Sequence, residues 1–147
     1  MKAIKKFENF IRRGIVKKQS PDNSRSEFLV KESEKTYNSL LRQVSKIGIE
    51  DENANGYVKL CHDVLTELIR AKMLLDGYNA SGFGAHEAEI SYLRNLGFNE
   101  SEVQFADQIR FFRNGILYYG TVLDKEYAEK VLSFTKINYF KLKDLIK

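Results

Sequence analysis

Hydrophobic residues recur at intervals of three and four along most of the chain, the spacing that places them on one face of an α-helix. This pattern predicts helices, and the segments that interrupt it contain glycine or proline. The first helix is predicted over Lys2 to Lys18, and the second over Arg25 to Ile47 with Gly48 as its stop. Four more are predicted: Gly56 to Asp76, His86 to Leu96, a fifth after an Asn99–Glu102 cap, and a sixth after an Asp124 cap.

No segment alternates hydrophobic and polar residues over a useful length, so no sheet is predicted. Ile49 to Asn55 is acidic and polar and is expected to be a loop or a loose first helical turn. We therefore expect an all-α fold, an antiparallel bundle of four to five core helices over residues 25–145, preceded by a basic N-terminal helix over residues 1–20. A length of 147 residues, with one proline and no linker-like stretch, predicts a single domain over residues 1–147.

Composition excludes several classes of site. The single cysteine, Cys61, excludes an internal disulfide and a cysteine-based metal motif. The two histidines, His62 and His86, have no carboxylates spaced to complete a zinc site, so no metal and no cofactor is expected. No apolar run approaches the roughly 20 residues that span a bilayer, and the N-terminus lacks the features of a secretory signal. We expect no membrane association and, by default, a cytoplasmic location.

Charge is unevenly distributed. The net charge is +4, and basic residues concentrate towards both ends of the chain. Such ends can attract a polyanion such as RNA, or they can be ordinary solvated helix faces. The basic residues concerned are Lys2, Lys5, Lys6, Arg12, Arg13, Lys17, Lys18, Lys136, Lys141, Lys143 and Lys147.

The predicted fifth helix carries the most informative residues. Arg110 and Arg113 are three residues apart and therefore share a helix face, and Asn114 follows directly. Tyr118 and Tyr119 come five and six residues after Arg113, within about 10 Å along a helix axis. Gly115 lies mid-helix, where glycine costs roughly 1 kcal/mol relative to alanine. It therefore indicates the close approach of another backbone, for which a second copy of this helix is one candidate.

The stretch from Phe112 to Gly120 resembles the motif of the HEPN superfamily, an arginine often followed by asparagine, with a histidine four to six residues further on. The helices predicted over Val58 to Leu75 and Glu126 to Leu142 resemble the second core helix and the closing helix of that family. The resemblance covers roughly residues 25–145. It implies a compact helical bundle that forms a homodimer, in which the two motif helices face each other. Many HEPN proteins are metal-independent endoribonucleases, often toxins encoded beside a minimal nucleotidyltransferase, and others bind nucleotides or serve as interaction modules.

The resemblance also implies roles for individual residues. Arg113 would stabilise the charge that develops on the phosphoryl oxygens during RNA cleavage, and Asn114 would orient the phosphate, with Arg110 as a further RNA-binding residue. Tyr118 and Tyr119 stand where the family histidine would fall. A tyrosine with a pKa of about 10 is a poor base at neutral pH, but it can donate a hydrogen bond, stack on a base or act as an acid.

The expected function is therefore a HEPN-domain protein that binds or acts on RNA or nucleotides, partnered by a nucleotidyltransferase, with a partly degenerate ribonuclease motif. Whether it is an enzyme stays open. The alternative is a non-catalytic helical module that binds nucleotides or proteins.

Other interpretations of these residues stay open. Arg110 and Arg113 can form salt bridges with Asp107 or a neighbouring helix, Asn114 can bond a loop, and the tyrosines can pack in the core or an interface. His62 beside Cys61 can form a thiol–imidazole pair, although neighbouring helix residues point about 100° apart. His86, which follows a glycine loop predicted over Gly77 to Gly84, is the histidine that can lie at a pocket rim and replace the missing base.

Overall fold

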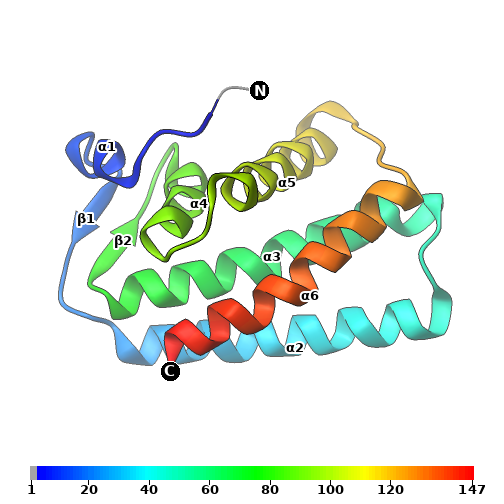
Figure 1. The fold of residues 1–147 in the computed structure, drawn as a ribbon, viewed down its shortest axis with the longest axis horizontal. Coiled ribbons are helices and arrows are strands. Elements are labelled where there is room, and N and C mark those ends of the chain that lie inside the picture. Colours follow the sequence, from blue (N-terminus) through cyan, green and yellow to red (C-terminus); the bar gives the residue numbers. More distant parts are fainter. Residues whose placement is uncertain (1–2) are drawn as a thin grey trace.

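The computed structural model describes residues 3–147 and shows a helical bundle with one small sheet (Figure 1). The predicted all-α class is confirmed, because the two strands have only three residues each. Met1 and Lys2, where the first predicted helix begins, lie outside the described residues. The elements are α1 Phe7–Arg12, β1 Val16–Lys18, α2 Asn23–Ile47, α3 Asp51–Leu75, β2 Tyr78–Ala80, α4 Ala85–Asn95, α5 Glu100–Tyr119 and α6 Lys125–Ile146.

Helix α3 forms the centre of the bundle. It packs against α2 and α6 and also against α4 and α5, and it contributes the largest share of buried side chains. Two small residues of α2 hydrogen-bond the backbone of α3. Ser26 Oγ donates to the carbonyl of Ala71 at 2.8 Å, and Ser33 Oγ donates to that of Val64 at 2.9 Å. The small serine side chains therefore bring α2 close to α3, and both hydroxyls are satisfied although they are buried.

Capping residues fix the ends of the helices. Asn99 and Glu102 form the predicted capping box of α5, and Asp124 Oδ1 accepts from the backbone N–H of Tyr127 at the start of α6. Of the two interpretations of Ile49 to Asn55, the loop is wrong and the first helical turn is confirmed, because α3 begins at Asp51. There the backbone N–H of Glu50 donates to Asn53 Oδ1 at 2.9 Å, so a polar first turn is a helix start.

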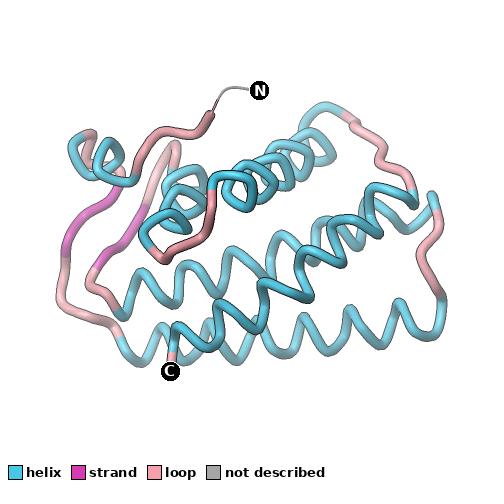
Figure 2. Tube along the Cα trace, viewed as in Figure 1, coloured by secondary structure: helices cyan, strands magenta, loops and turns pink. Residues whose placement is uncertain are grey.

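The N-terminal segment differs most from the prediction. Instead of one helix from Lys2 to Lys18, the six-residue α1 is followed by Gly14 at φ +76° and by β1. The left-handed conformation at Gly14 ends the helix, and β1 pairs antiparallel with β2, whose residues come from the predicted glycine loop (Figure 2). Short strands buried on one side follow no long alternation, which explains why the period-two pattern was invisible.

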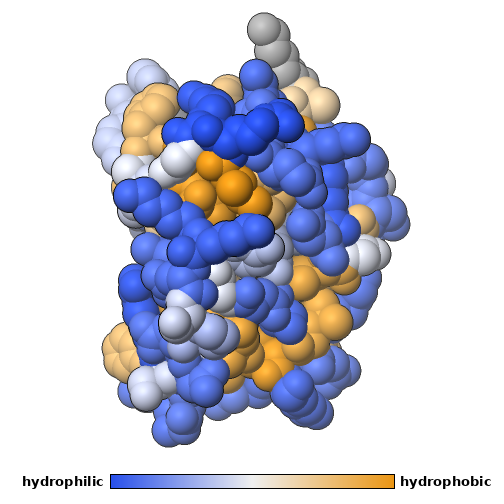
Figure 3. All heavy atoms as spheres, turned by 90° about the vertical axis from the view of Figure 1, so that its left-hand side faces the viewer, coloured by the Kyte–Doolittle hydropathy of each residue, from blue (hydrophilic) through white to orange (hydrophobic). Residues whose placement is uncertain are grey.

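The N-terminal segment lies against α4. Arg94 donates to the carbonyls of Ile4 and Lys5 at 2.7 and 2.9 Å, and the ring of Phe7 packs 4.5 Å from that of Tyr92. The face that carries α1 and β1 is largely hydrophilic, with hydrophobic atoms between the polar ones (Figure 3). Six basic side chains of this segment are exposed: Lys5, Lys6, Arg12, Arg13, Lys17 and Lys18. Among residues 3–147, no helix combines the length and apolar composition needed to cross a membrane.

Candidate functional site

One face of α5 changes in character along its length. In the first half of the helix this face carries Val103, Ala106 and Asp107, which are buried. The same stripe continues through Arg110 and Arg113 at spacings of three and four, but α4, which runs alongside, begins only at Ala85. An ion pair of 4.0 Å between Arg110 and Glu87 marks the first turn of α4. The packing face of α5 therefore extends past the start of α4 and becomes open.

A pocket of about 320 Å³ lies at this position. The loop between β2 and α4 forms one side, and the second half of α5 forms the other. Two glycines with positive φ, Gly82 at +78° and Gly84 at +92°, shape the loop, and Gly84 leaves the first turn of α4 without a side-chain cap. The lining residues are Gly82, Phe83, Gly84, Ala85, His86, Glu87, Arg110, Arg113, Asn114 and Tyr118.

The two arginines differ in their partners. Arg110 Nε donates to Asp107 Oδ1 at 2.7 Å, so the ion-pair interpretation holds for Arg110. For Arg113, no carboxylate in residues 3–147 lies within 4.0 Å, and neither Arg113 nor Asn114 has a side-chain hydrogen bond within that part of the chain. The guanidinium and amide of these neighbours are both partly exposed at the pocket. A charged, uncompensated arginine beside a free amide can bind an anion.

The two tyrosines lie at the end of α5 and are not core residues. Tyr118 is 72% exposed and lines the pocket, whereas Tyr119 is 86% exposed and does not line it. Large exposed apolar side chains accompany them. They lie in the loop before α4, on the second half of α5 and in the loop after α5: Phe83, Phe111, Leu117 and Val122. Together with the two tyrosines, we call these six residues the exposed apolar cluster.

The close approach predicted at Gly115 is present, but it comes from the same chain. A Cβ at position 115 would lie 2.5 Å from Oγ1 of Thr121, in the loop after α5. The expectation of another backbone, with a second copy of the helix as candidate, is therefore corrected. The glycine is needed because the chain folds back on the end of its own helix.

His86 is held in place by Glu89, a buried carboxylate that is paired with an arginine. Its Nδ1 lies 3.1 Å from Oε1 of Glu89, one turn along α4, and Glu89 is only 2% exposed. Arg70 of α3 donates to both oxygens of Glu89, at 2.6 and 3.2 Å. Burial raises the pKa of Glu89, but hydrogen bonds from His86 and Arg70 outweigh it and hold the pKa below its ordinary value. The i, i+3 spacing of His86 and Glu89 is visible in the sequence, whereas the role of Arg70 depends on the fold.

His62 lies behind this site, on α3. It is 3% exposed, neither ring nitrogen has a hydrogen-bond partner among the described residues, and its ring centroid is 6.3 Å from that of His86. Asp63 Oδ1 is 3.6 Å from Nδ1, too far for a hydrogen bond. Burial lowers the pKa of His62, and Arg113 and His86 lower it further against the opposing effect of Asp63. His62 is therefore uncharged at neutral pH.

The thiol–imidazole pair is not formed as a reactive site. Cys61 is 1% exposed, and burial raises its pKa to about 11 against a smaller opposing effect of Thr135. A protonated thiol without access to solvent is neither a nucleophile nor a metal ligand.

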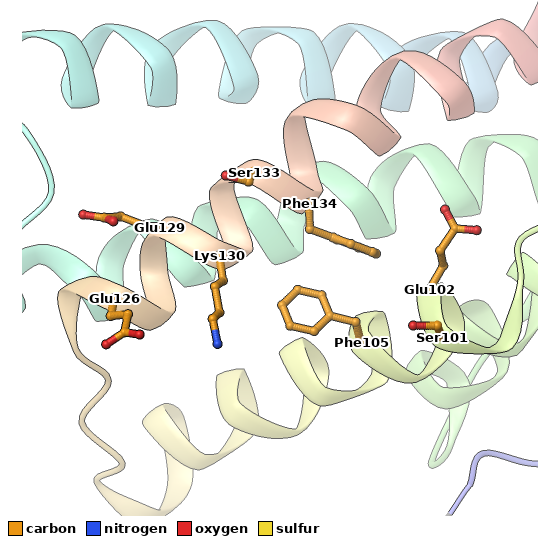
Figure 4. Close-up of a pocket in the computed structure, with 8 residues that line it drawn as sticks. All are labelled: Ser101, Glu102, Phe105, Glu126, Glu129, Lys130, Ser133 and Phe134. Carbon is orange, nitrogen blue, oxygen red and sulfur yellow. The ribbon is translucent and has the colours of Figure 1, made fainter.

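A larger pocket of about 540 Å³ lies between α5 and α6 (Figure 4). Phe105 and Phe134 form its apolar part, with ring centroids 4.9 Å apart. Its charged lining comprises three carboxylates and one lysine: Glu102, Glu126, Glu129 and Lys130. This excess of negative charge disfavours phosphate, so the smaller pocket at Arg113 is the better candidate for anion binding.

Among residues 3–147, no group of three or more histidine, cysteine, aspartate or glutamate side chains is placed to hold a metal ion. Comparison of the chain with protein-family models, with curated proteins and with solved structures gives no match.

Proposed function

We propose that this chain is a HEPN-like protein that binds RNA through its phosphate groups at the Arg113 pocket. One observation carries the proposal: the guanidinium of Arg113 lies beside the amide of Asn114 at an open pocket, and no carboxylate of the described chain compensates its charge. Arginine binds phosphate oxygens through a planar fork of donors, which makes phosphate the anion of choice for this site.

The start of α4 adds to the positive potential of the pocket. This 11-residue helix begins at the pocket without a side-chain cap, and residues of its first turn line the pocket, so the positive end of its dipole lies there. The exposed basic residues of α1 and β1 lie next to the glycine loop, because the backbone N–H of Ser81 donates to the carbonyl of Ile15 at 3.1 Å. They supply a basic surface beside the pocket for the rest of a polyanion.

We further propose that the protein acts as a homodimer, with the ends of two α5 helices facing each other. The exposed apolar cluster supports this arrangement, since large apolar side chains exposed on α5 and in the loops before α4 and after α5 favour association. A dimer through this end would place two Arg113 pockets in one cleft. A minimal nucleotidyltransferase as a second partner follows from the family resemblance.

The RNA-binding proposal is tested with a labelled single-stranded RNA by fluorescence anisotropy. Arg113→Ala is expected to weaken binding by about tenfold or more, which corresponds to the loss of one charge-assisted phosphate contact. The matched control is Arg42→Ala, which removes the same charge from an exposed site on α2. Equal affinities of the Arg113 and Arg42 variants, or no binding by the wild type, would refute the proposal.

The alternative function, a non-catalytic interaction module, is favoured by the pocket of Figure 4. Its aromatic floor and acidic rim suit a basic, apolar segment of a partner protein better than a nucleic acid. Under this alternative, RNA binding would be absent, and Phe105→Ala rather than Arg113→Ala would abolish association with a protein partner.

A further inference from the structure

The hydrogen bonds around His86 define which of its nitrogens is available. Glu89 is ionised at neutral pH, since hydrogen bonds from His86 and Arg70 outweigh its burial and hold its pKa low. An ionised carboxylate only accepts hydrogen bonds, so Nδ1 of His86 must carry the proton in the 3.1 Å contact. In the neutral imidazole, Nε2 then carries the free lone pair.

The environment fixes the imidazole without closing it off. Glu89 is itself locked by two hydrogen bonds from Arg70, so it holds the His86 ring in one orientation. His86 keeps 51% of its side chain exposed, and it lines the same pocket as Arg113 and Asn114. A carboxylate-bound histidine beside a free arginine provides a base and an anion site in one pocket.

We propose that His86 is the base of this site, which accepts the proton of the 2′-hydroxyl group of an RNA whose phosphate is bound by Arg113. The assignment rests on the proposed RNA binding and moves the base from α5, where the family motif has it, to the first turn of α4. In this assignment neither Tyr118 nor Tyr119 acts as the base.

The reaction balances without a metal or a redox partner. Nε2 of His86 accepts the hydroxyl proton while the 2′ oxygen forms a bond to the adjacent phosphorus. The bond from phosphorus to the 5′ oxygen of the next nucleotide breaks, and that oxygen takes a proton from solvent. The products are a 2′,3′-cyclic phosphate and a 5′-hydroxyl, and His86 then returns its proton to solvent.

Several charged and titratable groups lie around His86. Glu89 contacts it directly, Arg70 is bonded to Glu89, and His62 lies behind it uncharged. Glu87 on α4 and Arg110 and Arg113 on α5 line the same pocket, whereas Asp63 and Glu67 on α3 lie near Arg70.

The test measures RNA cleavage and RNA affinity separately, in the presence of EDTA. His86→Ala is expected to slow cleavage by about 100-fold or more, the usual contribution of a general base, and to leave RNA affinity within about threefold. Imidazole added to the buffer is expected to restore part of the rate, because the side chain removed is half exposed at an open pocket. Asn95→Ala, at the exposed far end of α4, is the control and is expected to cleave like the wild type.

Glu89→Gln tests the positioning role. The rate of cleavage is expected to fall about tenfold while RNA affinity stays within about threefold, because an amide does not hold the proton on Nδ1 of His86 as a carboxylate does. A purely structural role of Glu89 would instead weaken RNA binding together with the rate. Circular dichroism of each variant identifies any that fail to fold. If Glu89→Gln does not fold, the imidazole rescue of His86→Ala carries the test, and if His86→Ala does not fold, Glu89→Gln carries it.

The outcomes separate the two proposals. RNA binding that depends on Arg113, without cleavage by the wild type, would overturn the assignment of His86 and leave the binding function intact. Cleavage by His86→Ala at the wild-type rate would also overturn the assignment of His86. So would a loss of cleavage in Tyr118→Phe but not in His86→Ala. Absence of RNA binding by the wild type would instead refute the proposed function itself.

Discussion

The backbone of Gly115 lies directly against the side chain of Thr121. A Cβ at position 115 would come 2.5 Å from Oγ1 and 3.2 Å from Cβ of Thr121. Thr121 is held in place from two sides: its N–H donates to the carbonyl of Gly115 at 3.1 Å, and its carbonyl accepts from Nδ2 of Asn55 on α3 at 3.0 Å. Asn55 Oδ1 also accepts from the N–H of Leu123 at 2.8 Å. The loop after α5 is thus tied to α3, and it fixes the end of the helix that carries Tyr118.

Gly115→Ala is expected to destabilise the protein, although alanine favours a helix by about 1 kcal/mol. The new methyl group has to displace Thr121, whose backbone is bonded to both α5 and α3. We expect a net loss of about 1–2 kcal/mol in the free energy of unfolding, measured by urea denaturation.

A double-mutant cycle identifies the cause. In the Thr121→Ala background the nearest atom, Oγ1, is absent, so Gly115→Ala should cost less there than in the wild type. An equal cost in both backgrounds would show that the clash with Thr121 is not responsible.

The charge of Arg113 should appear in the salt dependence of RNA binding. Each phosphate contact to a single strand contributes about 0.7 to the slope of log affinity against log salt concentration. Arg113→Gln is expected to lower this slope by about that amount, measured by anisotropy titrations at several salt concentrations. Arg42→Gln, on α2, should leave the slope unchanged, and a slope that is equally reduced by both substitutions would show only a non-local charge effect.

The sequence predicts the long helices well, because the hydrophobic periodicity of an amphipathic helix is visible in its own residues. The α5 and α6 starts also follow from local capping residues, Asn99 and Asp124. The N-terminal segment could not be predicted in the same way. Its apolar residues fit a helical stripe, but Gly14 and the pairing of β1 with β2 decide the outcome, and β2 lies some 60 residues away along the chain.

The site shows the same division between local and non-local information. Arg113 and Asn114 stand out in the sequence, and their places at one pocket with Tyr118 agree with their helical spacing. The pairing of Arg110 with Asp107 follows from their i, i+3 spacing in the sequence, and Arg113 has no carboxylate three or four residues away. Only the fold decides whether another helix brings a carboxylate to Arg113. The ion pair between Arg70 and Glu89 joins two helices and becomes visible only in the fold.

The exposed apolar cluster should control the oligomeric state. Phe111 is 53% exposed, and a charge there would be buried without a partner in a dimer formed through the end of α5. Phe111→Glu is expected to raise the dimer dissociation constant by about 100-fold or more, measured by light scattering and sedimentation. Phe140→Glu is the matched control, because Phe140 is similarly exposed but lies on α6, outside the cluster. If only Phe140→Glu dissociated the dimer, the interface would lie outside the exposed apolar cluster. A monomeric wild type would refute the proposed homodimer.

The stability of the protein should depend on pH through Glu67, a partly exposed residue of α3. Burial, together with Asp63 and Glu32, raises its pKa from 4.5 to about 7, against the opposing charge of Arg70. The folded protein therefore holds this proton more tightly than the unfolded chain does. The resulting stabilisation of the protonated state is fully present below about pH 4.5, and stability is lost as the pH rises from there to about 7.

Glu67→Gln replaces the carboxyl with a group that stays neutral, so its effect should depend on pH. Near pH 4 the variant and the wild type should unfold at similar urea concentrations, whereas at pH 8 the variant should be more stable by about 1 kcal/mol, a figure reduced for the partial exposure of the side chain. Glu52→Gln, an exposed carboxyl at the start of the same helix, is the control and should show no such gain at pH 8. An equal difference between Glu67→Gln and the wild type at both pH values would contradict the prediction. Only a raised pKa of Glu67 makes its ionisation destabilise the fold, and that destabilisation appears at the higher pH alone.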